Sequence, residues 1–217
     1  MTATLQLGRD AVQRHAWDEG VDSLTAADRK AALSADDLEL LGVAAWWAGR
    51  PDEASDALER AFAGYEEVGR AEDAARVAIT LAYNAYRRLA APVGMGWQAR
   101  GERLLAALPD SPLHAQKTVY DAIGLLMQGH LDAGIESLDR AMEQARRTDN
   151  WDALYNAMSL KGMADVMAGR WREGLAELDE AATATSSGRL DLRAASDIFC
   201  TTIGACRSVG DLQRASQ

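Results

Sequence analysis

An internal repeat constrains the fold of this chain more than any other feature of its sequence. Each clear copy has a Gly, a small residue five positions later, a Leu four positions further on, and an Ala after three more. The full copies are Gly49, Ala54, Leu58 and Ala61; Gly129, Gly134, Leu138 and Ala141; and Gly169, Gly174, Leu178 and Ala181. Two partial copies are His15, Gly20, Leu24 and Ala27 at the start, and Gly210, Leu212 and Ala215 at the end. Self-similarity of this kind is the signature of a repeat architecture.

One more copy is expected between Ala61 and Gly129, where the pattern is degenerate. Pro92, Val93 and Gly96 fit it, but Arg100 and Arg103 fall where Leu and Ala belong. Leu104, Leu105 and Leu108 could carry the apolar face of this copy in a shifted register. With Gly96 as its small residue, the intervals between successive small residues from position 20 to position 215 are 34, 42, 38, 40 and 41 residues.

The spacing within each copy predicts a helix. Residues three and four apart are neighbours on a helix, so the small residue, the Leu and the Ala share one face. The Gly before them suits a left-handed helix C-cap, so each copy marks a turn between a first and a second helix. Ser34, followed by Asp36 and Asp37, is typical of the start of a first helix.

Two further patterns favour helices throughout. The four prolines, Pro51, Pro92, Pro109 and Pro112, all fall in or beside expected turns and none interrupts a helix interior. Strict alternation of apolar and polar residues is confined to very short stretches, which argues against strands. We therefore expect an all-α protein of about eleven or twelve helices, in five pairs plus a truncated sixth.

The repeat resembles the tetratricopeptide repeat. Leu41 and Gly42, with Gly49, Ala54 and Leu58, stand as in its consensus, although the period is longer than the usual length of about 34 residues. The resemblance covers nearly the whole chain. It implies an α-α solenoid, in which antiparallel helix pairs stack into a right-handed superhelix. We interpret residues 1–217 as a single repeat domain, truncated at its C-terminal end because Gln217 falls inside an expected helix.

A narrower resemblance concerns the run from Leu38 to Ala54. This run, and to a lesser extent Arg76–Ala78, looks like the helical region of actinobacterial multidomain regulators, which join such an array to a LuxR-type helix-turn-helix or to another effector module. The resemblance implies a scaffold or ligand-sensing part of a transcriptional or signalling regulator. Its partner would be a protein, a peptide or an effector domain absent from this chain, and it could form a homo-oligomer.

The charge of the chain argues against nucleic acid as a direct partner. The 217 residues carry 33 Asp and Glu against 23 Lys and Arg, a net charge of -10. An acidic chain repels the phosphate backbone, and no segment resembles a basic recognition helix. Residues 1–70 hold 14 acids and 7 bases. This acidic part is either a solvated outer face of the first helices or a docking face for a basic partner.

Other sequence features point to a cytoplasmic protein without cofactor or metal. The start lacks a signal peptide, and no run of about 18 apolar residues could span a membrane. Cys200 and Cys206 lie on different faces of one expected helix, so we interpret them as reduced core residues. His15, His114 and His130 lack partners at metal-ligand spacing. No phosphate loop or nucleophile motif occurs, so we expect no enzyme; the alternative is a stand-alone enzyme with a small-molecule site in the groove.

In tetratricopeptide arrays the first helices line a concave groove, and here the matched positions are largely apolar. They are Val43, Trp46, Trp47, Leu89, Val119, Ile123, Leu126, Met127, Met163, Val166 and Met167, with Arg88 and Arg207 as the cations. Either these side chains turn into the core between repeats, or they form a groove for a partner helix or apolar ligand. Our candidate binding residues are Trp46, Trp47, Tyr83, Asn84, Arg87, Arg88, Tyr120, Met127, Tyr155 and Asn156.

The charge balance yields a direct prediction. We expect no sequence-dependent DNA binding by this chain in an electrophoretic mobility-shift assay at physiological salt, because a net charge of -10 opposes the phosphate contacts that dominate affinity. Nanomolar binding that depends on the DNA sequence would contradict this prediction.

Overall fold

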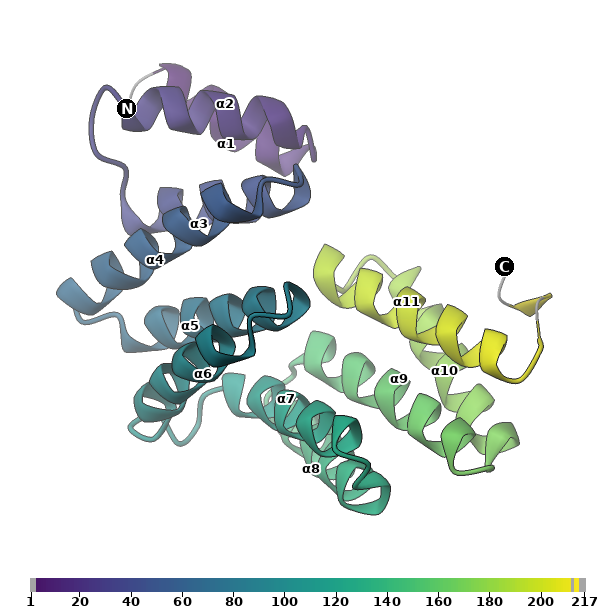
Figure 1. Ribbon diagram of the computed structural model, residues 1–217. Coiled ribbons are helices and arrows are strands. Elements are labelled where there is room, and N and C mark those ends of the chain that lie inside the picture. The colour runs from purple at the N-terminus through teal and green to yellow at the C-terminus, as the bar shows by residue number, and fades with distance from the viewer. Residues whose placement is uncertain (1–2, 212, 215–217) are drawn as a thin grey trace. The chain divides into compact units, whose positions relative to one another are not determined.

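The protein is all-α in the part of the chain that the computed structural model describes, residues 3–211, 213 and 214. Eleven helices and no strands occur in this part (Figure 1). They fall into two compact units, Met1–Leu108 and Pro109–Gln217. Unit 1 contains α1 (Ala3–Gln13), α2 (Trp17–Asp28), α3 (Ala35–Trp47), α4 (Pro51–Glu67), α5 (Ala71–Arg87) and α6 (Ala91–Leu105). Unit 2 contains α7 (Leu113–Met127), α8 (Leu131–Arg147), α9 (Trp151–Met167), α10 (Trp171–Thr185) and α11 (Leu192–Ser208).

Helices end at a nearly constant interval in both units. A residue with left-handed backbone follows most of them, such as Gly49 after α3 (φ 73°) and Gly69 after α4 (φ 73°). Residues 49, 69 and 89 in unit 1, and 129, 149 and 169 in unit 2, follow one another at 20 residues, so one helix and its turn occupy 20 positions there and a pair occupies 40. His15, Gly188 and Gly210 depart from this interval.

This interval corrects the register of the degenerate copy. Leu89, with φ 59°, occupies the turn position that Gly49 holds in the preceding pair, although a left-handed conformation is strained for a side chain of this size. Gly94, five positions later, is therefore the small residue, and it is buried against Tyr86 of α5. Gly96, the residue expected from the sequence, has no neighbour within 4 Å of a β-carbon built on it. The sequence did not reveal this register because Leu89 stands where the turn glycine is expected and Gln98 stands where the Leu is expected.

Paired helices approach closely where the repeat puts a small residue. A β-carbon built on Gly42 of α3 would lie 2.6 Å from Leu58 Cγ of α4. Gly8 with Leu24, and Gly162 with Leu178, repeat this contact at the same separation of 16 residues. Because van der Waals contact needs more than 3 Å, a side chain at these positions requires the facing Leu or the helix that carries it to move.

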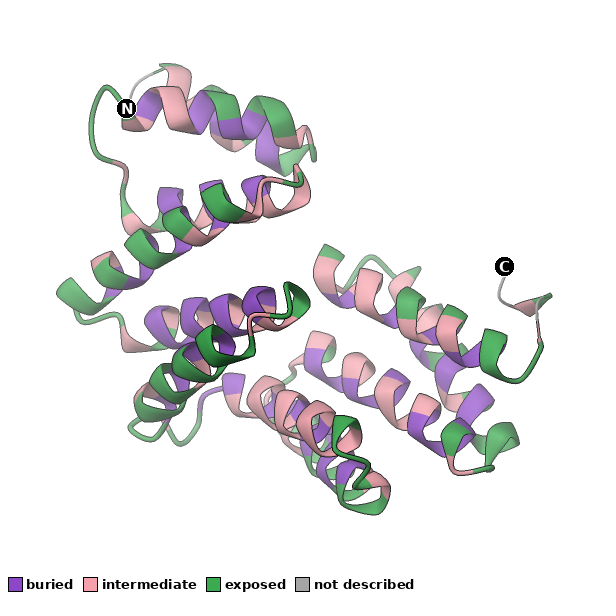
Figure 2. Ribbon diagram, viewed as in Figure 1, coloured by how far each residue is buried: buried purple, intermediate pink, exposed green. Residues whose placement is uncertain are grey.

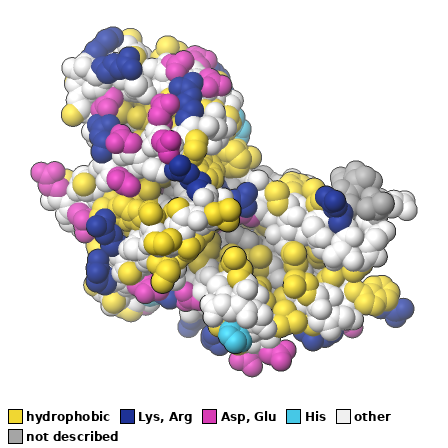
Figure 3. Space-filling model, viewed as in Figure 1, with side chains coloured by type: hydrophobic (Ala, Val, Ile, Leu, Met, Phe, Trp, Pro, Cys, Tyr) yellow, Lys and Arg dark blue, Asp and Glu magenta, His cyan; other side chains and the backbone are white. Residues whose placement is uncertain are grey.

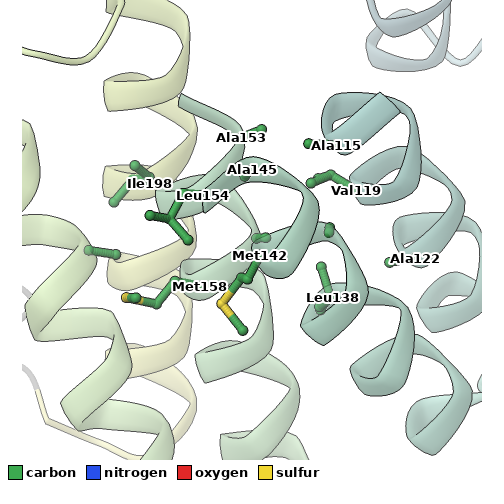
Figure 4. Close-up of a cluster of buried hydrophobic side chains, with 13 residues drawn as sticks. Ala115, Val119, Ala122, Leu138, Met142, Ala145, Ala153, Leu154, Met158 and Ile198 are labelled. Carbon is green, nitrogen blue, oxygen red and sulfur yellow. The ribbon is translucent and has the colours of Figure 1, made fainter. Parts of the chain in front are cut away.

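Each unit has its own apolar interior (Figure 2). In unit 1, α3, α4 and α5 bury Leu58, Phe62 and Val77 together, and Trp97 of α6 packs edge-to-face on Phe62. In unit 2, α7, α8, α9 and α11 share a cluster that includes Val119, Leu138, Met142, Leu154 and Ile198 (Figure 4). Each unit holds two clusters of buried side chains, to which both first and second helices contribute, as expected of stacked repeats.

The predicted caps and turns are largely confirmed. Ser34 precedes α3 and its hydroxyl oxygen accepts a hydrogen bond from the Asp37 amide at 3.2 Å. Pro51 is the first residue of α4, and Pro92 lies in the first turn of α6. Pro112 is the N-cap of α7 rather than its first helical residue, one position from the expected boundary.

Arginines of neighbouring helices pair with many acids in residues 1–70. Arg50 bonds Asp18 at 2.8 Å and Asp22 at 3.1 Å, and Arg9 bonds the buried Asp37 at 2.7 Å. Burial alone would raise the pKa of the Asp37 carboxyl, but hydrogen bonds from Arg9 and Ser34 outweigh it and hold that pKa below its usual value. Charged side chains of both signs are accordingly dense over α1–α4 on the face in Figure 3. These acids form ion pairs between helices. This favours the interpretation that they belong to a solvated outer face over the interpretation that they form a docking face for a basic partner.

The two cysteines are free, but they differ in exposure. Cys206 is buried in the core of unit 2, whereas Cys200 is exposed on α11. The expectation that both are core residues is therefore wrong for Cys200, because the rotation that separates their faces leaves only one of them inside.

The closest helix contact gives a stability prediction. In unit 2 a β-carbon on Gly162 would lie 2.6 Å from the Gly174 carbonyl oxygen, so Gly162→Ala should lower the free energy of unfolding by about 1–3 kcal/mol. Gly124 of α7 is the matched control, since nothing lies within 4 Å of its β-carbon position. Gly124→Ala should instead raise stability by about 0.5–1 kcal/mol. Urea denaturation measures both; equal effects would contradict the close contact.

Candidate binding surface

Two repeat positions near the C-terminal ends of α3, α5, α7 and α9 carry side chains that are half-buried or exposed. One column contains Val43, Tyr83, Ile123 and Met163, and the other, four residues later, contains Trp47, Arg87, Met127 and Met167. Members of each column are 40 residues apart, so α3, α5, α7 and α9 carry them at the same helical position. Residues four apart lie on one helix face, so each first helix offers one side chain from each column.

In unit 2 these positions hold four apolar side chains, which we call the methionine patch: Ile123, Met127, Met163 and Met167. Ile123 and Met163 are half-buried against the core clusters. Met127 is 84 % exposed and Met167 is 68 % exposed. Their helices, α7 and α9, are in contact, so the four side chains belong to adjacent helices of one unit. Gly204 of α11 lies beside Met163, where a β-carbon would be 4.0 Å from Met163 Cε, so α11 borders the patch with bare backbone.

In unit 1 the same positions hold Val43, Trp47, Tyr83 and Arg87. The Trp47 indole stacks on Trp17 with ring centroids 6.2 Å apart, and Trp17 stacks on His15 at 4.9 Å. The Arg87 guanidinium lies over the Tyr83 ring, 5.8 Å from its centroid. In unit 1 the rings of Trp47 and Tyr83 are therefore already in contact with Trp17 and Arg87, whereas unit 2 has flexible methionines at three of the four positions.

Trp46 differs from its neighbour Trp47. It packs against the cluster of Val12, Val21 and Leu41 while remaining partly exposed. Its repeat position is that of Tyr86, which lies over Gly94, so this position serves the contact between paired helices. The two tryptophans therefore have different surroundings: Trp46 packs against the buried cluster, and Trp47 stacks on Trp17 at the start of α2.

Several sequence candidates lie in the interior rather than on the surface. Asn84 is 2 % exposed, and neither atom of its amide has a hydrogen-bond partner, so it is not a groove residue. Val119 and Val166 are 1 % and 7 % exposed. At these three positions the side chain turns into the core between repeats, which is one of the two alternatives above. The reason is that α5, α7 and α9 each have helices packed on two sides.

Two other candidates belong to a turn. Arg88 donates from Nη2 to Asp52 Oδ1 at 2.6 Å, which ties the end of α5 to the start of α4. Leu89 is 93 % exposed in the left-handed turn itself. Neither side chain lies in the two columns.

The remaining candidates lie toward the other end of the first helices of unit 2. Tyr120 is half-buried and accepts a hydrogen bond from Gln116 Nε2 at 3.3 Å. Burial raises the pKa of its phenol, and the nearby Arg193 opposes that rise. Tyr155 stacks on Trp151 at 6.5 Å, and Asn156 is half-buried. By helical spacing Tyr120 and Asn156 flank the methionine patch with polar groups.

A charged network joins α9 to α10 beside this surface. Lys161 Nζ donates to Glu177 Oε1 at 2.5 Å and to Asp165 Oδ2 at 3.3 Å, and Arg170 bonds Asp165 at 2.6 Å. Burial raises the pKa of the Glu177 carboxyl even though Lys161 opposes the rise. Burial also opposes the charge of Lys161, but its two carboxylate partners outweigh that effect and raise its pKa. The network holds the two helices in register.

Two kinds of site are absent from the described part of the chain. No helix there is long and apolar enough to cross a bilayer. No group of three or more His, Cys, Asp or Glu residues in that part could hold a metal ion.

Solved structures share this fold. The chain is similar to the nearly identical TPR-like repeats of a putative kinesin light chain from Podosopora anserina, with a TM-score of 0.57, 16 % identity, and coverage of 86 % of this chain and 95 % of that one. It is similar to BtubC (BKLC) from P. vanneervenii, with a TM-score of 0.58, 14 % identity, and coverage of 100 % and 88 %. No family model and no curated protein matches the sequence.

A further similar structure is that of a Rap protein complexed with Competence and Sporulation Factor. Its TM-score is 0.58 at 13 % identity, and the match covers 98 % of this chain and 72 % of that one. At such identities these likenesses concern the fold alone. They confirm that the protein is an all-α, tetratricopeptide-like solenoid.

The two tryptophans give a mutational prediction. Trp46→Ala should lower the free energy of unfolding by about 3 kcal/mol, because it removes the ring that packs against the buried cluster of Val12, Val21 and Leu41. Trp47→Ala should cost about 1 kcal/mol, mainly the loss of its ring contact with Trp17. Chemical denaturation compares them, and equal large losses would mean that the Trp47 position is also core.

Proposed function

We propose that this protein is a non-catalytic binding array that holds a protein or peptide segment on the methionine patch of unit 2. One observation carries the proposal: Met127 and Met167 are 84 % and 68 % exposed on adjacent first helices, with Ile123 and Met163 beside them. Large apolar side chains exposed on neighbouring helices of a folded domain are typical of an interaction site. Methionines suit this role because their unbranched, polarisable side chains adapt to varied partners.

The chemistry of the patch favours an amphipathic helix as the partner. Two apolar side chains per helix on α7 and α9 offer a surface for anchors spaced at i, i+3 and i+7. Tyr120 and Asn156, toward the other ends of these helices, would meet the polar edge of such a segment. The Rap protein solved with Competence and Sporulation Factor supports the idea that this fold can hold a ligand.

We further propose that the array serves a transcriptional or signalling regulator whose effector lies on another segment or chain. The resemblance of the run Leu38–Ala54 to actinobacterial regulators supports this context. In that role, partner binding would alter the effector by favouring one packing of the helices over another. A cytoplasmic location belongs to the same proposal.

Peptide binding to selectively labelled protein tests the site. Peptides would be selected on the wild-type protein from a displayed library of amphipathic helices, then titrated into protein carrying ¹³C in its methionine methyl groups. The signals of Met127, Met163 and Met167 should shift. Those of Met142 and Met158, which are 7 % and 8 % exposed, should not, and they serve as internal controls.

Substitution gives the quantitative prediction. Met127→Glu and Met167→Glu should each weaken the selected peptides at least about tenfold, or about 1.4 kcal/mol, because a charge replaces an apolar contact. Val68→Glu is the control, since Val68 is 66 % exposed on unit 1. Binding that tolerates both methionine variants would overturn the assignment.

A further inference from the structure

The outer side of α6 departs from a pattern that the other second helices share. Six positions, which recur at an interval of 40 residues, are exposed in α4, α6, α8 and α10 alike. In α4 they are Asp52, Glu53, Asp56, Glu59, Arg60 and Ala63. In α6, much of which is exposed (Figure 2), they form what we call the α6 face: Pro92, Val93, Gly96, Ala99, Arg100 and Arg103.

The charge of the α6 face is opposite to that of its counterparts. The six positions hold four acids and one Arg in α4 and again in α8, and three acids and one Arg in α10. The α6 face holds two Arg and no acid, and the one acid elsewhere on α6 is Glu102. This change extends beyond α6, because residues 74–101 contain no Asp or Glu in a chain that has 33 of them. The α6 face is therefore a local positive surface on an acidic protein.

The arginines of the α6 face carry charge that the protein does not pair. Arg60 of α4 bonds Asp28 at 2.8 Å, whereas the guanidinium of its counterpart Arg100 lies over the Trp97 ring, 4.5 Å from the ring centroid. Neither Arg100 nor Arg103 forms an ion pair within the part of the chain that the structure describes. Both charges are thus available to an external acid.

Apolar and small residues accompany these charges. Val93 is 54 % exposed, and Leu89 in the preceding turn is 93 % exposed. A β-carbon built on Gly96 would meet nothing within 4 Å, so bare backbone lies between Val93 and Arg100. In α4 and α10 the position of Val93 is held by Glu, as expected for a side of the helix that faces water.

The exposure of this face does not depend on where the array begins or ends. α4 packs on α3 and α5, and α8 packs on α7 and α9, yet the same six positions are exposed in both helices. They therefore lie on the side of a second helix that faces away from the neighbouring pairs. A further helix pair stacked on the array would leave this side open.

We propose that the α6 face docks an acidic helical segment of a partner protein, at a site separate from the methionine patch. Asp or Glu side chains of that segment would pair with Arg100 and Arg103, which lie three residues apart on one side of α6. Its apolar side chains would cover Val93 and Leu89, and the bare backbone at Gly96 allows a second helix to approach closely. A helix suits this face because its own side chains, three and four residues apart, match the spacing on α6.

The charge of the rest of unit 1 favours such a segment over a membrane or a nucleic acid. A bilayer or a duplex presents an extended array of negative charges and would also meet the acidic part of unit 1, where residues 1–70 hold 14 acids and 7 bases. A single helix is only about 10–12 Å wide and can contact α6 alone. Its acids then meet Arg100 and Arg103 without the repulsion that a broad polyanion would experience.

Peptide selection tests the charge preference. A displayed library of helical peptides, with acidic, basic and apolar residues varied on one face, would be selected on the Met127→Glu/Met167→Glu protein, which excludes binders of the methionine patch. The net charge of -10 attracts basic peptides in general, so enrichment of acidic ones requires a local positive surface. We expect enrichment of Asp and Glu, and binding that weakens as the salt concentration rises.

Substitutions taken from the other second helices locate the site. Three variants each install the acid that α4 or α8 has at the same position: Val93→Glu, Ala99→Glu and Arg103→Glu. The fold already accepts these side chains there, so circular dichroism should stay unchanged. Each variant should weaken the selected peptides at least about tenfold, because it places a like charge beside the acidic segment. Ala133→Glu is the matched control, since Ala133 is exposed at the position of Val93 on α8, and it should bind like its parent.

Several outcomes would overturn the proposal. A library that yields no binder, or binders without enrichment of Asp and Glu, would show that the α6 face does not dock an acidic helix. Acidic peptides that bind all three variants unchanged would place the site elsewhere. Co-sedimentation with phosphatidylserine-containing vesicles that Val93→Glu abolishes would assign the face to an anionic membrane instead. None of these results bears on the methionine patch, because both of its exposed methionines are replaced in the protein used.

Discussion

The close contact between a glycine of a first helix and a leucine of its partner is the constraint on which the rest of this structure depends. Leu58 sits over Gly42 and Leu178 sits over Gly162, each in space that a β-carbon would occupy. Because interiors are close-packed, these contacts set both the distance and the register of each helix pair. Ion pairs such as Arg50–Asp18 and Lys161–Glu177 then join neighbouring elements around a geometry that packing has already fixed.

That register decides which side chains remain available for binding. Among α3, α5, α7 and α9, which are spaced at 40 residues, one position on each helix serves the contact with the paired helix, and two other positions are half-buried or exposed. Tyr86 lies at the contact position, and Met127 and Met167 lie at one of the other two. The scaffold therefore holds a few variable positions on an otherwise repetitive frame, and the residue types there give each unit its own chemistry. Unit 1 fills them with stacked rings and an arginine, and unit 2 fills them with adaptable apolar chains.

Two apolar surfaces of unit 2 thus have different origins. The methionine patch lies at positions whose residue type differs between α3, α5, α7 and α9. A partner bound there would contact side chains that the repeat does not fix. The second surface, one face of α11, lies at positions that are buried in α9. On that face Phe199 is 48 % exposed and Ile203 is 42 % exposed.

The sequence by itself determined the helical class, the pairing of helices and most of the turns, because these follow from local spacing: Gly49 before Ala54, a cap at Ser34, and prolines confined to turns. It misplaced the degenerate pair, since Leu89 holds a strained turn that glycine usually marks, and only the close approach of Gly94 to Tyr86 reveals the register. It named Trp47 and Met127 as candidates for the surface, but it could not separate them from Asn84 or Val119. Adjacent positions on a helix differ by about 100° in direction, so whether a side chain meets a neighbouring helix or solvent depends on what packs on each side. Only the tertiary structure supplies those neighbours, and it therefore decided that Asn84 is interior, that Cys200 is exposed, and that α11 keeps an apolar face uncovered by the described helices.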